Sequence, residues 1–127
     1  MLFDVYCKEI RSLLEFAVPV WHPALTVNDS KMIERIQKVA FKIILRDRYI
    51  SSEFSCNNFN TTTLANRREK LCLNFAKKSL KSENSFFSTV KKNIDTRSKQ
   101  NRVQEYKCRT ERYKKSSLPY MAKLLNK

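Results

Sequence analysis

Apolar residues recur at intervals of three to four positions in three stretches of the chain, and this spacing predicts helices. The first stretch begins at Phe3 and ends where Pro19 and Pro23 stop a helix from continuing. The second follows capping side chains at 28–30 and extends to about residue 46. Its apolar stripe, expected to face the core, comprises Met32, Ile33, Ile36, Val39, Ala40, Ile43 and Ile44.

A third helix is predicted over about 62–80, after a polar connection at 47–63 and a run of threonines that can cap it. The residues of its predicted buried face are Leu64, Leu71, Cys72, Phe75 and Ala76. A short helix around 86–90 and a closing helical turn at 121–125 follow, separated by a charged stretch that we expect to be extended or disordered when unbound. The predicted fold is all-α, with a bundle of three to four helices over 1–92 and a basic, partly disordered tail over 93–127.

Charge changes this picture, because 26 Lys and Arg residues against 12 Asp and Glu residues give the chain a net charge of +14. The first 63 residues are almost neutral at +1, whereas residues 64–127 carry +13. An excess of this size favours a polyanionic partner. We therefore expect the backbone of RNA or DNA as the partner.

The second predicted helix places five cations within an arc of about 80° beside its apolar stripe, over roughly 22 Å of helix axis. We call these five residues the basic stripe: Lys31, Arg35, Lys38, Lys42 and Arg46. A solvent-facing helix surface usually mixes charges of both signs, whereas only Glu34 and Asp47 lie near this one. Contact with phosphates is therefore favoured over a merely solvated face.

The third helix and the tail supply further candidate contacts. On the helix these are Arg67, Lys70, Lys77 and Lys81, and in the tail they are Arg109, Arg112, Lys114 and Lys115. Cations interleaved with Tyr106 and Tyr113 suit single-stranded nucleic acid, although a solubilising linker would have a similar composition. For Arg68, next to the apolar face, we expect a structural role that pairs it with Glu15 or Glu34.

Several classes of function are disfavoured. The chain has no glycine, which excludes the glycine-dependent phosphate loops of nucleotide enzymes. Four widely spaced cysteines and the single His22 do not form a zinc pattern, so we expect no metal and no cofactor. With no secretory signal and no apolar run of membrane-spanning length, the expectation is an intracellular protein, nuclear or cytoplasmic, that binds neither a membrane nor a small-molecule substrate.

Three segments in order, IRSLLEFAVPVWHP at 10–23, IERIQKVA at 33–40 and RRE at 67–69, together resemble a known family. They are similar to the region after the polymerase palm in reverse transcriptases of non-LTR retrotransposons of the jockey and CR1 type. The segment RYKKSSLPY at 112–120, followed by LLN at 124–126, resembles the end of those polyproteins. The resemblance implies the thumb and post-thumb part of an RNA-directed DNA polymerase, which holds primer and template beside an upstream palm.

The sequence also departs from that family. The polymerase centre needs a Tyr-x-Asp-Asp turn and an upstream aspartate, whereas Asp4, Asp29, Asp47 and Asp95 are scattered singly. We therefore expect a nucleic-acid-binding fragment that is not an enzyme on its own. Two alternatives stay open, namely a host-recruited helical module that binds a protein partner and a decayed transposon relic.

Overall fold

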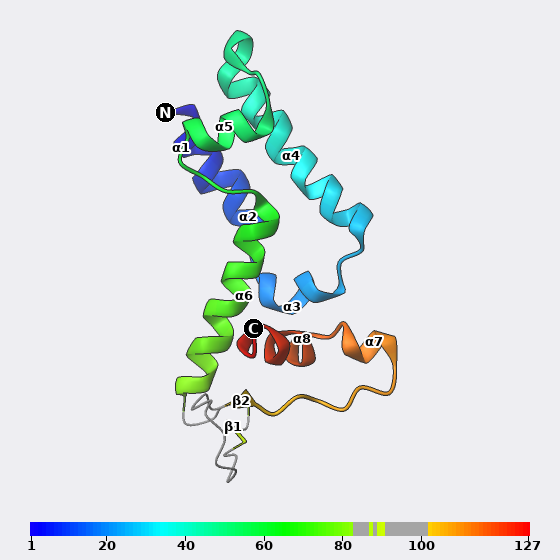
Figure 1. The fold of residues 1–127 in the computed structure, drawn as a ribbon. Helices are drawn as coiled ribbons and strands as arrows, with labels where there is room; N and C mark the ends of the chain where they lie inside the picture. Colours follow the sequence, from blue (N-terminus) through cyan, green and yellow to red (C-terminus); the bar gives the residue numbers. More distant parts are fainter. Residues whose placement is uncertain (83–86, 88, 91–101) are drawn as a thin grey trace. The chain divides into compact units, whose positions relative to one another are not determined.

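The computed structural model describes residues 1–82, 87, 89–90 and 102–127, and these residues are mostly helical (Figure 1). They form two compact units. The first comprises Met1–Val18 and Leu25–Lys70, and the second comprises Pro19–Ala24 and Leu71–Lys127. The all-α prediction is confirmed, with one pair of two-residue strands added. The units do not follow the predicted division at residue 92, because C-terminal residues share a core with the end of the third long helix.

The first helical stretch is interrupted by a π-helical segment, Tyr6–Arg11, between α1 (Leu2–Val5) and α2 (Ser12–Glu15). The wider π turn changes the phase of the apolar positions that follow it. Tyr6, at the start of the π-helical segment, is buried, whereas Leu13, after it, is exposed. The helix ends before the prolines, because Phe16 is extended and Ala17 adopts a left-handed φ of 50°.

α3 (Val18–Trp21) and a 3₁₀ turn, His22–Ala24, lead to α4 (Val27–Leu45). The cap of α4 is Thr26, whose hydroxyl accepts from the backbone N–H of Asp29 at 3.2 Å, while the Asp29 carboxylate accepts from the N–H of Thr26 at 3.3 Å. This reciprocal pair is a capping box, which satisfies two otherwise unbonded N–H groups. The predicted second helix is thus present, beginning one residue before the predicted capping residues.

The face of α4 that packs is only partly the predicted one, because Ala40 of the predicted stripe is buried and Ile44 packs against the core. Gln37, Ala40 and Phe41 are buried, while four members of the predicted stripe are exposed. Those four are Met32, Ile36, Val39 and Ile43. The reason is aromatic packing: Phe41 lies against Tyr6 and Phe59 at ring-centroid distances of 6.1 and 5.7 Å, and these contacts turn the aliphatic stripe to solvent.

The segment 47–63, expected to be a connection, contains helical structure. A 3₁₀ turn, Arg46–Arg48, is followed by α5 (Ser52–Asn58), whose cap is Ser51. Cys56 of α5 joins the core that Tyr6, Ala40 and Phe41 form.

The third predicted helix is α6 (Leu64–Lys81), and the Thr63 hydroxyl accepts from the N–H of Asn66 near its start. Its predicted buried face is only partly confirmed. Leu64, Cys72 and Ala76 are buried, whereas Phe75 is exposed.

In the second unit, β1 (Thr89–Val90) pairs antiparallel with β2 (Arg102–Val103), and Thr89 lies opposite Val103. The helix predicted around 86–90 is therefore wrong at its C-terminal end. α7 (Glu111–Lys114) and α8 (Ser117–Leu125) follow, the second of them longer than the predicted turn. The core residues of this unit are Ala76, Phe87, Val103, Met121 and Ala122. An extended or disordered state was predicted for residues 91–115. Of these, 91–101 lie outside the described residues, whereas the described remainder contains β2 and α7.

Candidate nucleic-acid interface

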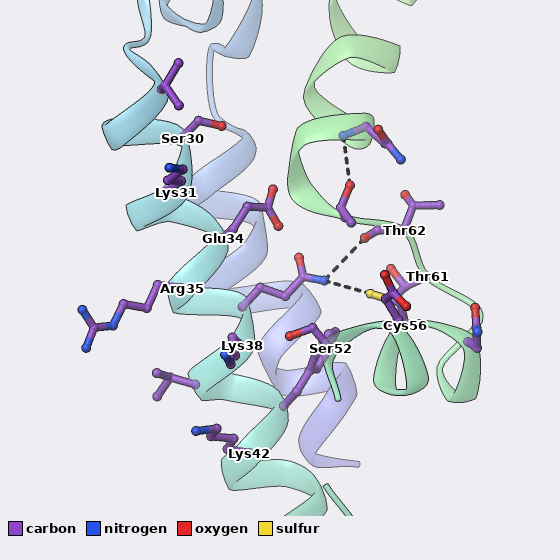
Figure 2. A pocket seen from close by; sticks show the side chains of 18 residues that line it. Ser30, Lys31, Glu34, Arg35, Lys38, Lys42, Ser52, Cys56, Thr61 and Thr62 are labelled. Carbon is purple, nitrogen blue, oxygen red and sulfur yellow. Dashed lines mark hydrogen bonds between the residues drawn. The ribbon is translucent and has the colours of Figure 1, made fainter. Parts of the chain in front are cut away.

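A groove of about 1150 Å³ lies in the first unit between α4 on one side and α5 with the segment 61–66 on the other. Figure 2 shows four cations on successive turns of α4 along this groove: Lys31, Arg35, Lys38 and Lys42. The opposite wall presents hydroxyl and amide groups from Ser52, Asn57, Thr61, Thr62 and Thr63. We refer to this feature as the α4 groove.

The four cations of the α4 groove are exposed, and within the described part of the chain none of them forms an ion pair. Along α4 the four cations lie three or four positions apart, and Glu34 is the one carboxylate on this helix that lines the groove with them. One of them, Lys42, lies over an aromatic ring, with its Nζ 5.6 Å from the ring centroid of Tyr49. The wall can therefore offer its positive charges to an anion.

Two carboxylates line the α4 groove, and one of them is committed to the fold. Glu34 accepts from the backbone N–H groups of Leu64 at 3.3 Å and Ala65 at 2.6 Å, and lies 3.8 Å from Arg68 Nη2. A carboxylate at the N-terminus of a helix is stabilised by the unbonded N–H groups there. Glu34 thus neutralises little of the positive charge of α4. The other carboxylate that lines the groove is the exposed Glu53.

The polar wall is held against α4 by a buried amide. Gln37 Nε2 donates to the Thr62 carbonyl at 3.4 Å and lies 3.6 Å from Cys56 Sγ. Burial raises the pKa of the Cys56 thiol, and the nearby negative charge of Glu34 adds to this rise. The thiol therefore stays protonated at neutral pH and is a poor nucleophile.

Arg68 has the structural role that the sequence suggested. Its side chain is 1% exposed, and its Nη2 donates to Ser30 Oγ at 2.9 Å beside the Glu34 carboxylate. Burial lowers the pKa of Arg68, while the charge of Glu34 acts in the opposite direction. Arg68 therefore links the start of α6 to the start of α4.

Arg67, predicted to contact the nucleic-acid backbone, is held inside the first unit. Its Nε and Nη2 both donate to the Glu15 carboxylate, the second at 2.9 Å, and this hydrogen bonding raises the pKa of Arg67. Bidentate pairs of this kind are among the stronger polar contacts in proteins. The structure thus pairs Glu15 with Arg67 and Glu34 with Arg68.

Arg46 is separated from the other members of the basic stripe. α4 ends at Leu45, and Arg46 adopts a left-handed φ of 49° outside the α4 groove. The predicted arc assumed a helix that continues through residue 46. Four of the five stripe residues are therefore brought together.

The remaining predicted contacts are exposed but are divided between the units. Lys70 belongs to the first unit, and the others belong to the second. These are Lys77, Lys81, Arg109, Arg112, Lys114 and Lys115. Lys114 Nζ lies 3.1 Å from a Glu111 carboxylate oxygen, an exposed pair of little energetic weight.

Sequence reasoning missed the polar wall of the α4 groove and the amide of Gln37 that holds it. Serines, threonines and asparagines at 51–63 were available as a signal, but they are also typical of loops. Only the contact of Gln37 with Thr62, across 25 positions, makes them part of a site.

Nothing in the described residues resembles a metal site, since no three His, Cys, Asp or Glu side chains gather there. Across 1–82, 87, 89–90 and 102–127, no helix combines the length and apolar character needed to cross a membrane. Comparisons with protein-family models, with curated proteins and with solved structures found no match for this chain. Within the first unit, the geometry suits the binding of an extended anion.

Proposed function

We propose that this chain binds RNA or DNA by its phosphate backbone, with the α4 groove as the main contact surface. The observation that carries the proposal is the row of four unpaired cations along one wall of that groove. Phosphate contacts provide most of the affinity in binding that does not depend on base sequence. The hydroxyl and amide groups of the opposite wall supply donors and acceptors for sugars and bases.

The dimensions of the cation row suit a nucleic-acid strand. Lys31 and Lys42 are eleven positions apart on α4, which corresponds to about 16 Å of helix axis. One strand of a duplex has a phosphate for roughly every 3.4 Å of axis, so about five phosphates fit along this length. Several contacts can therefore form at once without bending the partner.

The resemblance of 10–23, 33–40 and 67–69 to non-LTR reverse transcriptases supports a more specific proposal. In that context the chain is the thumb and post-thumb region, which grips primer and template next to a palm encoded upstream. The chemistry of polymerisation would belong to that palm, and this chain would bind without catalysing.

The test compares two double variants that remove the same number of charges from the first unit. Arg35→Ala/Lys38→Ala empties the middle of the cation row, and the control Lys8→Ala/Arg48→Ala removes two exposed cations that do not line the groove. Binding is measured by fluorescence anisotropy with labelled single-stranded RNA, single-stranded DNA and an RNA–DNA hybrid. Circular dichroism verifies that each variant keeps its helical content.

The groove variant should weaken binding at least tenfold, because two phosphate contacts are lost, while the control should change it less than threefold. Equal losses in both variants would mean that net charge alone drives binding. That result would exclude the α4 groove as the interface.

A further inference from the structure

α4 has a second surface, which overlaps the groove lining only at Val39. Met32, Ile36, Val39 and Ile43 lie on its solvent side and are 43–68% exposed, and we call these four residues the apolar seam. Single exposed apolar residues are common, but a continuous row of four large ones on one helix is typical of an interaction site. Within the first unit, α4 packs against the core with a different face, which carries Gln37 and Phe41.

The spacing of the apolar seam indicates what kind of surface fits it. Its members are separated by four, three and four positions, the alternation of a heptad repeat. This average of 3.5 residues keeps a row facing a partner helix, with side chains of one helix entering gaps of the other. The seam runs for about 16 Å, or roughly three helical turns. The apolar seam is therefore suited to packing against another helix.

Charge beside the apolar seam narrows the choice of partner. At 100° per residue, Arg35 and Lys42 lie directly next to the seam, with Lys31 and Lys38 beyond them on the same side. Figure 2 shows the Arg35 side chain extending away from the polar wall of the α4 groove. The seam therefore has cations along one edge, with Glu34 turned towards the start of α6.

A second copy of the chain would fit this edge poorly. Pairing two seams would bring two rows of cations together, and each chain carries a net charge of +14. Like charges that face each other across a helix pair are destabilising, and charges at these flanking positions select partners. The edge is complementary to carboxylates instead.

We propose that the apolar seam docks an amphipathic helix of a protein partner, with apolar residues at heptad spacing and Asp or Glu along the edge that meets Arg35 and Lys42. This surface adjoins the proposed contact with nucleic acid and shares Arg35, Val39 and Lys42 with it. An acidic helix on the seam therefore competes with nucleic acid for Arg35 and Lys42.

The test uses the full chain and two labelled model peptides of about three heptads. The acidic probe carries Leu at the heptad core positions and Glu at the flanking positions, and the basic probe differs only in having Lys for each Glu. Ile36→Gln/Ile43→Gln disrupts the seam at two residues that do not line the α4 groove. Leu13→Gln/Ile50→Gln is the control, because these residues of the first unit are 76% and 73% exposed and lie outside α4.

The acidic probe should bind the unmodified chain and the control equally, and at least tenfold more tightly than the basic probe does. Ile36→Gln/Ile43→Gln should weaken that binding at least tenfold while keeping the affinity for RNA within threefold, because neither residue lines the α4 groove. The RNA measurement distinguishes the two proposals. If the proposed function is wrong, the groove variant loses no RNA affinity, whereas the binding of the acidic probe to the seam is unaffected by that result.

Three results would overturn the proposal. The acidic probe could fail to bind, or it could bind the seam variant as well as the unmodified chain. Sedimentation could also show a dimer of this chain that Ile36→Gln/Ile43→Gln abolishes, which would make a second copy the occupant.

Discussion

The phenol of Tyr6 is one of the buried groups of the first unit whose hydrogen bonding is incomplete. Its side chain is 3% exposed among Ala40, Phe41 and Cys56, and its hydroxyl has no hydrogen-bond partner among the residues described. Burial raises the pKa of Tyr6 to about 12 from its ordinary 10.0. A buried hydroxyl without a partner costs about 1–3 kcal/mol. The ring of Tyr6 therefore stabilises the folded state, whereas its hydroxyl group destabilises it.

Tyr6→Phe should therefore raise the free energy of unfolding by about 1 kcal/mol at pH 7. The gain should grow with pH. The tyrosine ionises near pH 10 in the unfolded chain but only near pH 12 in the folded one, so the unmodified chain loses stability between pH 10 and 12, whereas the phenylalanine variant does not. At pH 11 the phenylalanine variant should gain about another 1.4 kcal/mol over the unmodified chain. Urea unfolding of both chains at pH 7 and pH 11 measures this, and a gap that does not widen would refute it.

The roles of Arg67 and Arg68 show how far single residues could be predicted. The position of Arg68 near an apolar face indicated a structural role, which its contacts with Ser30 and Glu34 confirm. The sequence around Arg67 gave no sign that it forms an ion pair within the fold, because its partner Glu15 lies 52 positions away. Pairings across such distances depend on how the helices pack, which helical spacing does not specify.

At the scale of elements, Glu34 connects two helices of the first unit. Its carboxylate bonds to the N–H groups of Leu64 and Ala65 at the start of α6 and lies beside the buried Arg68. It therefore acts as a cap supplied from α4 and as a counter-charge. Both contributions disappear together if the carboxylate is removed.

Glu34→Ala should lower the free energy of unfolding by about 2–3 kcal/mol, since two N–H groups and a buried guanidinium lose their partner. Glu53→Ala removes the other carboxylate that lines the α4 groove and should change stability by less than about 0.5 kcal/mol. Thermal and urea unfolding of both variants compare the two directly. Equal free energies of unfolding for the two variants would show that the contacts of Glu34 do not stabilise the fold.

Helix positions were more predictable than helix faces. The extents of α4 and α6 follow from caps and apolar spacing, and both agree with the structure within a few residues. Apolar spacing groups residues on one face, but it does not say whether that face or a neighbouring aromatic one reaches the core. The turn after α2 gave no sequence signal either, because Ala17 adopts the left-handed conformation that glycine usually takes.

At the scale of the whole molecule, the excess positive charge of the sequence and the proposed anion site lie in different places. Residues 64–127 carry nearly all the excess charge, whereas the α4 groove is built within the nearly neutral first half. The four α4 cations were predictable because they share one helix. The polar wall facing them was not, because it depends on contacts between segments about 20 to 30 positions apart.

The salt dependence of nucleic-acid binding tests the central claim most directly. Each phosphate contact with a single strand contributes about 0.7 to the slope of log affinity against log salt concentration. Four contacts in the α4 groove therefore predict a slope near −3, or steeper if cations of the second unit take part. Replacing Lys31, Arg35, Lys38 and Lys42 together by alanine should reduce the slope by about 3. A flat response of the unmodified chain, or an unchanged slope in that variant, would contradict the account.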